Sequence, residues 1–431
     1  MQVNPDTCQE AARDLPVLTH YDVLVCGGGP AGIAAAIASA RSGARTGLLE
    51  VHNCLGGVWT AGALSWILDY ENKPGIMTEI LETLEARGAR AHCDDNTGEK
   101  TGGYDVEMMK VLLDELCLEA DVDVHLQTRV CAAARNENNR LRFAIIESRS
   151  GREAISADVF IDCTGDGDLA AQAGCGFDFG RPEDGATQPF SLMAIVVGLD
   201  PKEVRPYFRY RSDPWATCKE RLKAEMERGG HSPSYGKPTL FHIRGNMFAM
   251  MANHEYEFSS LNARDITRAT LQARHELHNL VNGLRSLGGC WRNMQIVMTG
   301  AQIGIREGRR VHGRYTVTEQ DLQTGARHED AVCRVTFGVD VHATKATNAN
   351  KGIEKSPIKS QHYDIPLRAL IAKDVDGLMM AGRNISGDFL AHASYRVTGN
   401  SVALGEAAGK VASKAAQTDR LPQEVTWQEV L

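Results

Sequence analysis

Three glycines spaced as G-x-G-x-x-G, at Gly27, Gly29 and Gly32, point more directly to a bound ligand than any other residues of this sequence. They follow an apolar run and precede a stretch of small residues, so we expect a strand at residues 21–26 and a helix at residues 31–42. The first glycine would permit a tight turn, the second would let the backbone approach a diphosphate, and the third would bring helix and strand together. Free N–H groups at the start of the helix would then bind the phosphates.

Glu50, which closes the next expected strand, completes this pattern. A carboxylate at this position can accept hydrogen bonds from both ribose hydroxyls, and it disfavours the 2′-phosphate of NADP. No Lys-Ser or Lys-Thr pair follows the glycines, so the turn does not match a mononucleotide P-loop. The order of strand, helix, strand and acid therefore predicts a site for the ADP part of FAD or NAD.

Two further segments extend the expected site beyond ADP. The segment CLGGVWTAG, at residues 54–62, follows Glu50, and its glycines would let backbone N–H groups continue along the diphosphate toward a second ring system. The segment FIDCTGDGDLAAQAG, at residues 160–174, predicts an apolar strand that ends in short side chains at the edge of the nucleotide site. These short side chains would allow a close approach to the adenosine half.

The C-terminal segment at residues 376–416 favours FAD over NAD. It predicts a strand that delivers Gly382 and Arg383 to a cleft, a carboxylate at Asp388 for the ribityl hydroxyls, and a small-residue helix that opens near Gly399. A helix N-terminus facing the N1/C2=O edge of a flavin would favour the anionic reduced ring. We therefore expect FAD contacts from Gly27, Gly29, Pro30, Ala31, Gly32, Glu50, Val51, Gly56, Gly57, Val58, Val130, Thr164, Gly165, Asp166, Gly382, Arg383, Asp388, Gly399, Asn400 and Ser401.

These motifs together resemble the FAD-dependent oxidoreductase family, whose members share the glycine turn, the DCTGDGD segment and a C-terminal AGRNIS…ALGEAAG segment. The resemblance also includes residues 304–322, 337–342 and 363–378, and it covers most of residues 20–416. It implies an α/β fold: a Rossmann-like FAD-binding domain of the glutathione-reductase-like superfamily with an inserted α+β substrate lobe.

The texture of the sequence changes near residue 181, where prolines, aromatic residues and charges mix, and returns to an α/β texture near residue 363. Part of the intervening stretch, near residues 330–345, could belong with the FAD-binding domain. We therefore expect an N-terminal lead-in at 1–19, a FAD-binding domain at 20–180 and 363–418, an inserted substrate lobe at 181–362, and a tail at 419–431.

His392 and Arg396, in the segment AHASYR, are the first candidates for catalysis because they lie between two expected FAD-contacting elements. On a helix, their spacing of four residues would place both on one face. The histidine could act as a general base toward an alcohol, while the arginine holds a carboxylate or an oxyanion. Arg306, Asp340 and His342 are further candidates, implied mainly by the family resemblance. A structural role for each of these residues is the alternative.

The expected reaction is the transfer of a hydride between flavin N5 and a small polar metabolite, such as a hydroxylated or carbohydrate-like compound. Only one dinucleotide motif is present, so the electron donor or acceptor would be a transient visitor, which the sequence does not identify. The arginine that marks flavin hydroxylases is missing from TGDGDLAAQAG, and no cysteine pair supports a disulfide reductase. The alternatives are a FAD-binding redox sensor or assembly partner without catalysis, and an NAD-dependent dehydrogenase.

The composition of the 431 residues indicates a soluble, cytoplasmic protein without nucleic-acid or membrane partners. The net charge is −8, and the sequence shows neither a signal peptide nor an apolar run long enough to span a membrane. Eleven cysteines without a C-x-x-C pair favour free thiols, and no cluster has the spacing of metal ligands. At Cys54 we expect a buried thiol and not a covalent flavin link. A homo-oligomer is left open.

Overall fold

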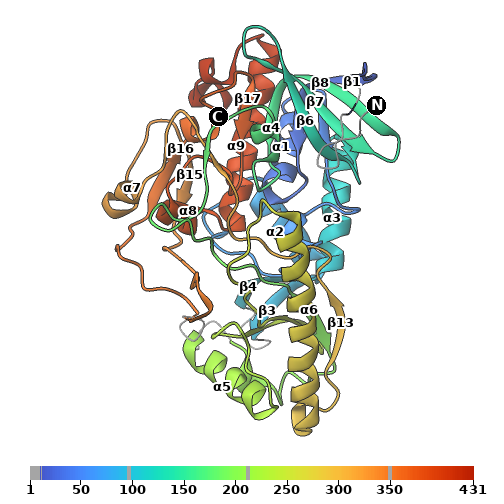
Figure 1. The fold of residues 1–431 in the computed structure, drawn as a ribbon, viewed down its shortest axis with the longest axis vertical. Helices are drawn as coiled ribbons and strands as arrows, with labels where there is room; N and C mark the ends of the chain where they lie inside the picture. Colours follow the sequence, from blue (N-terminus) through green and yellow to red (C-terminus); the bar gives the residue numbers. More distant parts are fainter. Residues whose placement is uncertain (1–9, 11, 95–98, 210–213, 348–351) are drawn as a thin grey trace, which may run out of the picture.

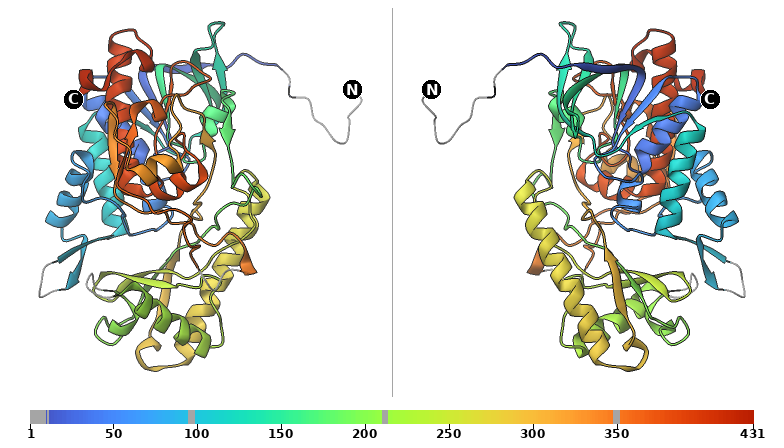
Figure 2. Two further views of the ribbon diagram at one scale, coloured as in Figure 1. Left: turned by 90° about the vertical axis from the view of Figure 1, so that its left-hand side faces the viewer. Right: turned by 90° about the vertical axis from the view of Figure 1, so that its right-hand side faces the viewer.

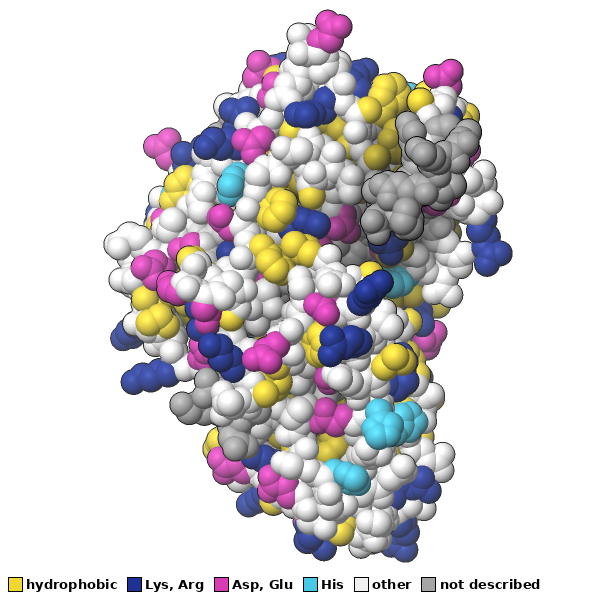
Figure 3. All heavy atoms as spheres, viewed as in Figure 1, with side chains coloured by type: hydrophobic (Ala, Val, Ile, Leu, Met, Phe, Trp, Pro, Cys, Tyr) yellow, Lys and Arg dark blue, Asp and Glu magenta, His cyan; other side chains and the backbone are white. Residues whose placement is uncertain are grey.

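The computed structural model describes residue 10 and residues 12–94, 99–209, 214–347 and 352–431. Figure 1 shows an elongated molecule with an upper lobe, which contains both ends of the described chain, and a lower lobe around helices α5 (Trp215–Arg228) and α6 (Ala263–Ser286). No helix in the described part of the chain has the length and apolarity needed to span a bilayer. On the face drawn in Figure 3, basic and acidic side chains are interspersed over both lobes.

The upper lobe is built on a seven-stranded, mostly parallel sheet, which confirms the expected α/β class. The strand order is β5-β2-β1-β8-β7-β6, and β17 also pairs with β8. Strand β8 pairs with two strands along the same edge. Its first half pairs with β7, and its last residues pair with β17. The strands are β1 (Val17–Cys26), β2 (Thr46–Leu49), β5 (Asp123–His125), β6 (Arg129–Arg135), β7 (Leu141–Ser148), β8 (Gly151–Asp162) and β17 (Leu378–Met380).

Strand β1 begins earlier than expected, so residues 17–19 belong to the sheet and not to a loose lead-in. The start of this strand pairs with β8, but its side chains are exposed, with Val17 56% accessible. Exposed positions carry no core-facing hydrophobic pattern, which is the signal that predicts strands. The rest of the expected lead-in, residues 1–9 and 11, lies outside the described residues.

Helices α1 (Pro30–Arg41) and α9 (Thr398–Gln417) pack against each other beside the sheet, although their sequences are far apart. Their contact is very close because both consist largely of small residues. A Cβ atom added to Gly405 would lie 2.0 Å from the Ala31 oxygen, and one added to Gly409 would lie 2.2 Å from the Ala35 oxygen. The small-residue composition of the C-terminal helix therefore serves its packing on the nucleotide-binding helix.

Five further helices and two small pairs of strands complete the upper lobe. The helices are α2 (Ile76–Ala86), α3 (Val106–Glu119), α4 (Asp168–Gln172), α7 (Glu319–Thr324) and α8 (Phe389–Tyr395), of which α3 is capped by the Asp105 side chain. The strand pairs are β9 (Phe177–Asp178) with β14 (Arg310–Val311), and β15 (Ala331–Val335) with β16 (Tyr363–Pro366). A hairpin of β3 (Arg90–Asp94) and β4 (Glu99–Tyr104) reaches toward the lower lobe.

The lower lobe contains a four-stranded antiparallel sheet in the order β11-β12-β10-β13, with α5 and α6 packed on it (Figure 2). It has a hydrophobic core of its own, which includes Phe248, Leu277 and Trp291. Its strands are β10 (Ala194–Val197), β11 (Thr239–Arg244), β12 (Met247–Met251) and β13 (Gln295–Thr299). All of these elements fall inside the predicted insert at 181–362.

The chain returns to the upper lobe earlier than the predicted boundary at 362. Strand β14 pairs with β9, and β15 pairs with β16 and packs near α9. Residues from about 310 to 335 therefore belong to the upper lobe. The segment that follows them contributes to the junction with the lower lobe. The domain boundaries themselves stay predictions.

Candidate functional site

The glycine turn has the backbone geometry that a dinucleotide requires. Gly27 has φ +103°, and a Cβ atom there would lie 2.4 Å from the Cys163 oxygen. A Cβ atom on Gly32 would lie 1.7 Å from the Gly27 oxygen, so neither position accepts a side chain. Gly29 differs, because an added Cβ atom would meet nothing within 4 Å. The space beside Gly29, at the start of α1, is thus open for a ligand.

Glu50 is held at the edge of this space by two backbone N–H groups. Gly28 donates to Oε2 at 2.8 Å, and His52 donates to Oε1 at 2.7 Å. The residue is 4% exposed, so its carboxylate has a fixed position at the end of β2. The expected second glycine pair lies against the turn, since a Cβ atom on Gly57 would be 3.0 Å from the Gly29 Cα atom. Val58 follows Gly57 in a short 3₁₀ turn.

The distant C-terminal segment reaches the same place. A Cβ atom on Gly382 would lie 3.2 Å from the Ala31 Cβ atom and 4.0 Å from the Ser401 hydroxyl. The end of β17, the first turn of α1 and the first turn of α9 therefore meet beside the glycine turn. Asn400 in that turn of α9 is fully buried, and its Nδ2 atom has no hydrogen-bond partner among the described residues. A buried donor without a partner fits a site for a polar ligand atom.

Several other residues that we expect to contact FAD form hydrogen bonds or ion pairs with protein residues. Arg383 pairs with Asp166 at 2.9 Å, and Gly165 approaches the same guanidinium. Burial raises the pKa of Asp166, while Arg383 opposes this rise. Thr164 donates its hydroxyl proton to Asp162 at 2.7 Å. These contacts fix the shape of the turn after β8.

Asp388, expected to bind ribityl hydroxyls, has both carboxylate oxygens occupied by backbone donors. Oδ1 caps α8 by accepting from the Ala391 N–H at 2.8 Å, and Oδ2 accepts from the Glu319 N–H at 2.5 Å. This geometry favours a structural role for Asp388. Val51 is 41% exposed, and Val130 lies half-buried in β6.

A second group of expected site residues meets at the junction of the lobes. Arg396 ends α8 and directly precedes Val397, the N-cap of α9. Its Nη2 atom donates to the Asp340 carbonyl at 2.8 Å and lies 3.4 Å from the Asp340 carboxylate. The same atom is 3.3 Å from the side-chain oxygen of Gln188. We call the group of Arg396, Arg306, Asp340, His342 and Gln188 the junction cluster.

Arg306 brings a second guanidinium into this cluster without a carboxylate bonded to it. It donates to the Pro189 carbonyl at 2.6 Å, to the Ser191 hydroxyl at 2.9 Å and to the Met251 sulfur at 3.8 Å. Burial, followed by repulsion from Arg396, lowers the pKa of Arg306 to about 10. Its side chain is half-buried, so part of the guanidinium side chain stays accessible.

His342 pairs with Asp340 inside the same cluster. The His342 Nε2 atom is 3.1 Å from the Asp340 carboxylate, and Nδ1 is 3.1 Å from Nε2 of His254. Burial, with a contribution from Arg306, lowers the pKa of His342 to about 4. Burial raises the pKa of Asp340, but His342, Arg396 and Arg306 outweigh it, so this carboxyl stays ionised.

His392 lies in the protein interior and not in the junction cluster. It is fully buried, and neither ring nitrogen has a well-formed hydrogen bond to a described residue. Burial, followed by Arg310, Arg396 and Arg383, lowers its pKa well below the usual range. A neutral, enclosed imidazole is a poor proton acceptor, so its surroundings favour a packing role.

The comparisons with known proteins agree with this geometry. The sequence profile of the family described as FAD dependent oxidoreductase matches residues 22–431. The chain belongs to the FAD-dependent oxidoreductase family. No protein of curated function matches its sequence.

Among solved structures, a geranylgeranyl bacteriochlorophyll reductase-like protein from Thermoplasma acidophilum is 15% identical. The alignment covers 93% of this chain and 80% of that protein, with a TM-score of 0.51. The myxobacterial chondrochloren halogenase is 11% identical over 94% of this chain and 77% of its own, with a TM-score of 0.47. The p-nitrophenol 4-monooxygenase from Pseudomonas putida is 14% identical over 69% of this chain and 70% of its own, with a TM-score of 0.40. The first of these likenesses supports the fold.

FAD is therefore the cofactor of this oxidoreductase, and the residues around the glycine turn fit it. The open space at Gly29, the fixed Glu50 carboxylate and the unpaired Nδ2 atom of Asn400 lie where the diphosphate, the ribose and the ring system are expected. We assign the adenosine half to the turn of Gly27 and Glu50, and the ring half to the α9 terminus. Individual contacts remain predictions.

The sequence did not reveal Gln188, which belongs to the junction cluster, or His254, Tyr235 and Tyr256, which surround it. Tyr235 stacks on His254 with ring centroids 4.0 Å apart, and the Tyr256 hydroxyl is 3.2 Å from His254 Nδ1. These residues come from separate segments with no common spacing, so no periodic pattern marks them. The only available signal was the concentration of polar aromatic residues in NHEYEF, at residues 253–258.

Glu255, next to His254, allows a test of burial at this junction. It is 7% exposed, its Oε1 atom has no partner among the described residues, and burial together with Glu276 raises its pKa to about 8. The folded state thus binds a proton that the unfolded state releases near pH 4.5, so stability falls as pH rises from about 4.5 to 8. We expect Glu255→Gln to raise the melting temperature by a few degrees at pH 8 and to leave it unchanged at pH 4. Equal melting temperatures at pH 8 would contradict this burial effect.

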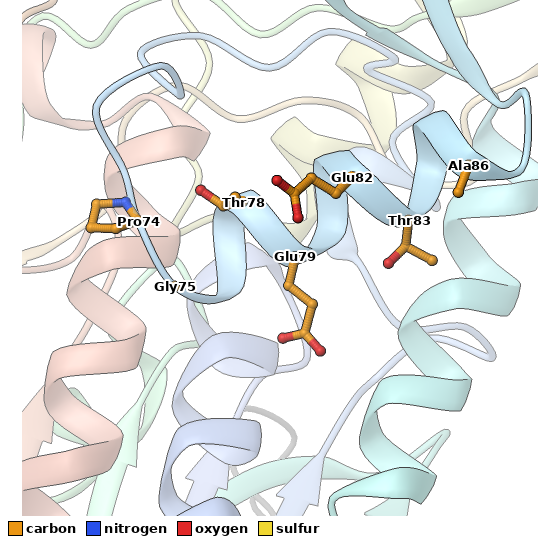
Figure 4. A pocket seen from close by; sticks show the side chains of 7 residues that line it. All are labelled: Pro74, Gly75, Thr78, Glu79, Glu82, Thr83 and Ala86. Carbon is orange, nitrogen blue, oxygen red and sulfur yellow. The ribbon is translucent and has the colours of Figure 1, made fainter.

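A groove of about 500 Å³ lies elsewhere, on the outer face of α2 (Figure 4). It is lined by residues from Pro74 to Ala86, and its Glu79 is engaged by Arg41 at 2.6 Å. No member of the junction cluster lines it. Among the described residues, His20, Asp22 and Asp158 are the one group with metal-ligand proximity, and they lie at the molecular surface without a further sign of a metal. The nine cysteines whose side chains are described, including Cys54, are free.

Proposed function

We propose that this FAD-dependent oxidoreductase transfers a hydride between flavin N5 and a small polar metabolite that carries a negative charge or a polarised oxygen. The junction cluster is the proposed substrate site, with Arg396 and Arg306 as binding residues. Arg396 adjoins the α9 terminus, where the flavin ring is expected, and Arg306 comes from the segment that follows the lower sheet. The site would thus take its substrate between the two lobes.

The observation that carries this proposal is the charge balance of the junction cluster. Arg306 and Arg396 contribute two positive charges, Asp340 contributes one negative charge, and His342 is neutral. The neighbouring Arg310 and Glu307 neutralise each other in an ion pair of 2.6 Å. A cation that is largely withdrawn from water and lacks a counter-ion is costly unless a ligand supplies the opposite charge. A carboxylate or an oxyanion would supply that charge.

The residues of the site have separate roles in this mechanism. FAD supplies the two-electron chemistry when it is bound. Arg306 would hold the anionic group of the substrate, and Arg396 would orient its reacting oxygen while the Asp340 carbonyl holds the guanidinium in place. Asp340, held by His342, lies 3.4 Å from Arg396 and interacts electrostatically with Arg306, and it would exchange the substrate proton. His392, the first candidate from the sequence, is assigned a packing role.

The test is the absorption spectrum of the purified protein. It is followed by an anaerobic screen for metabolites that remove the yellow absorption band of the oxidised flavin. We expect a yellow protein that is bleached by hydroxy acids or related anionic compounds and not by neutral polyols of the same size. A yellow protein bleached equally by neutral and anionic compounds would contradict the role of the two arginines. A protein that no metabolite bleaches, but that copurifies with one stable partner, would favour a redox sensor.

A further inference from the structure

A chain of hydrogen bonds leads away from the junction cluster through side chains that the proposed function does not use. It runs from the Asp340 carboxylate to His342 Nε2 at 3.1 Å, from His342 Nδ1 to His254 Nε2 at 3.1 Å, and from His254 Nδ1 to the Tyr256 hydroxyl at 3.2 Å. The Tyr256 hydroxyl also lies 3.0 Å from the Ser234 carbonyl. Each link joins a group that can both donate and accept a proton.

From this geometry we infer that Asp340, His342, His254 and Tyr256 form a proton relay that connects the substrate site to the half-buried Tyr256 and Ser234 of the lower lobe. The inference rests on the proposed function, because the relay would carry the proton that accompanies hydride transfer. His342, His254 and Tyr256 would act on that proton through Asp340 and not by contact with the substrate.

The bonds fix one set of tautomers while Asp340 is ionised. His342 must donate from Nε2 to Asp340, so its Nδ1 atom accepts from His254 Nε2, and His254 Nδ1 accepts from Tyr256. A proton on Asp340 favours the opposite set, in which each imidazole carries its proton on Nδ1 and the Tyr256 hydroxyl donates to the Ser234 carbonyl. No hydrogen bond joins the two nitrogens of one ring, so each imidazole reaches this set by exchanging its own proton from Nε2 to Nδ1 before the next transfer. The two sets differ by one proton, and the carbonyl gives the tyrosine proton a partner in the second.

The step balances for the oxidation of a hydroxyl group. The substrate loses a hydride from carbon to FAD and the O–H proton to Asp340, so it is oxidised by two electrons while FAD is reduced. In the reversed set of bonds, Tyr256 releases a proton to water, and the protons on His254, His342 and Asp340 each move one bond along the chain. Asp340 is then ionised again and ready for the next substrate.

The charges at the two ends favour movement in this direction. Arg306 and Arg396 lie near Asp340, and Lys219 of α5 interacts with it electrostatically. Glu276 of α6 accepts a hydrogen bond from the Ser234 hydroxyl at 2.7 Å and lies near Tyr256. Cations at the substrate end repel a proton, and Glu276 at the far end attracts it. Tyr235 packs on both imidazoles between the two ends.

The extent of burial is also suited to a relay. His254 is 1% exposed and His342 is 6% exposed, so water does not replace their hydrogen bonds. Asp340 keeps a 23% accessible side chain, and Tyr256 and Ser234 are half-buried, so both ends can exchange protons with groups outside the chain. A network that only fixed the fold would not need accessible groups at both of its ends.

The first test follows the imidazole nitrogens of the FAD-loaded protein by ¹⁵N NMR after selective labelling of histidine. In the wild type, we expect His342 and His254 each to carry their proton on Nε2. Asp340→Leu removes the acceptor that holds the proton on His342 Nε2, so both histidines should become tautomer mixtures, although His254 does not touch residue 340. The control is Tyr315→Phe, which removes a tyrosine hydrogen bond of 2.8 Å to Asp321 in the upper lobe. An unchanged His254 signal in Asp340→Leu would overturn the relay.

The second test uses the metabolite that bleaches the flavin in the screen described above. Tyr256→Phe and His254→Gln should slow anaerobic bleaching by about 10- to 100-fold without weakening metabolite binding, and added imidazole should restore part of the rate. His242→Gln, in the same lobe and bonded to the Gly245 carbonyl, should bleach at the wild-type rate. Unchanged rates in both relay variants would refute the relay even if the proposed function holds. If no metabolite bleaches the wild type, the proposed function fails, and the NMR result still decides the relay.

Discussion

Replacing Gly29 by alanine should give a folded protein that no longer retains FAD. Gly29 has an ordinary backbone conformation, with φ −73°, and an added Cβ atom would touch nothing within 4 Å, so the change does not disturb the protein itself. The methyl group would instead occupy the space in which the diphosphate approaches the backbone. We expect FAD affinity to fall by at least about tenfold, while the FAD-free protein unfolds within about 1 kcal/mol of the wild type, because alanine is a poorer N-cap residue than glycine.

Gly32→Ala should have a different outcome in the same experiment. Its Cβ atom would lie 1.7 Å from the Gly27 oxygen, so the strand, the turn and the helix must separate. We expect loss of FAD together with a lower melting temperature of the FAD-free protein. Flavin content after gel filtration and thermal unfolding without FAD measure the two effects. Gly338→Ala serves as the control, because its Cβ atom would meet only the Ser360 hydroxyl, at 3.7 Å. Full flavin content in Gly29→Ala would refute the assigned diphosphate site.

Arg310→Met should destabilise the protein strongly, whereas Arg306→Met should leave its stability nearly unchanged. Arg310 is 2% exposed and pairs with Glu307, which is fully buried, and its guanidinium also bonds the carbonyls of Gly387 and Gly180. Removing it leaves a buried carboxylate without its cation, at a cost of about 3–5 kcal/mol. The double variant Arg310→Met with Glu307→Gln should regain part of this loss because no buried charge remains.

Arg306 bonds only neutral groups, so methionine at this position removes a buried cation that lacks a counter-ion. The lost hydrogen bond to the Pro189 carbonyl offsets that gain, and we expect the free energy of unfolding to stay within about 1 kcal/mol of the wild type. Binding of a simple carboxylate such as malonate, followed through the flavin spectrum, should weaken by about 10- to 100-fold. Wild-type malonate affinity in Arg306→Met would show that Arg306 does not hold the anion. Urea unfolding separates the stability effect from the binding effect.

The nucleotide-binding half of this fold follows from local patterns in the sequence. Gly27 adopts a positive φ that few other residues adopt, Gly32 has no room for a side chain, and the small residues of α9 indicate a close helix contact. These features are visible without knowledge of the distant chain. The start of β1 was missed because its side chains face water and show no hydrophobic alternation.

The junction cluster could be predicted only in part. Arg306, His342 and Arg396 were named from the sequence, but the neighbours that decide their chemistry come from segments more than 80 residues away, as with His254 and His342. Burial also changes roles in ways that spacing does not reveal. His392 and Arg396 share a helix, yet the histidine is enclosed by the core while the arginine reaches the junction. Pairing across lobes is a property of tertiary structure, for which one sequence offers no periodic signal.

The position of β17 beside β8 has a consequence for how the protein is made. The expected FAD site includes residues 378–401, yet the glycine turn beside them leaves the ribosome some 350 residues earlier. During that interval one edge of the last residues of β8 has no neighbour, and the surface that α1 presents to α9 is uncovered. The expected site can therefore form only after residues 378–401 have been synthesised.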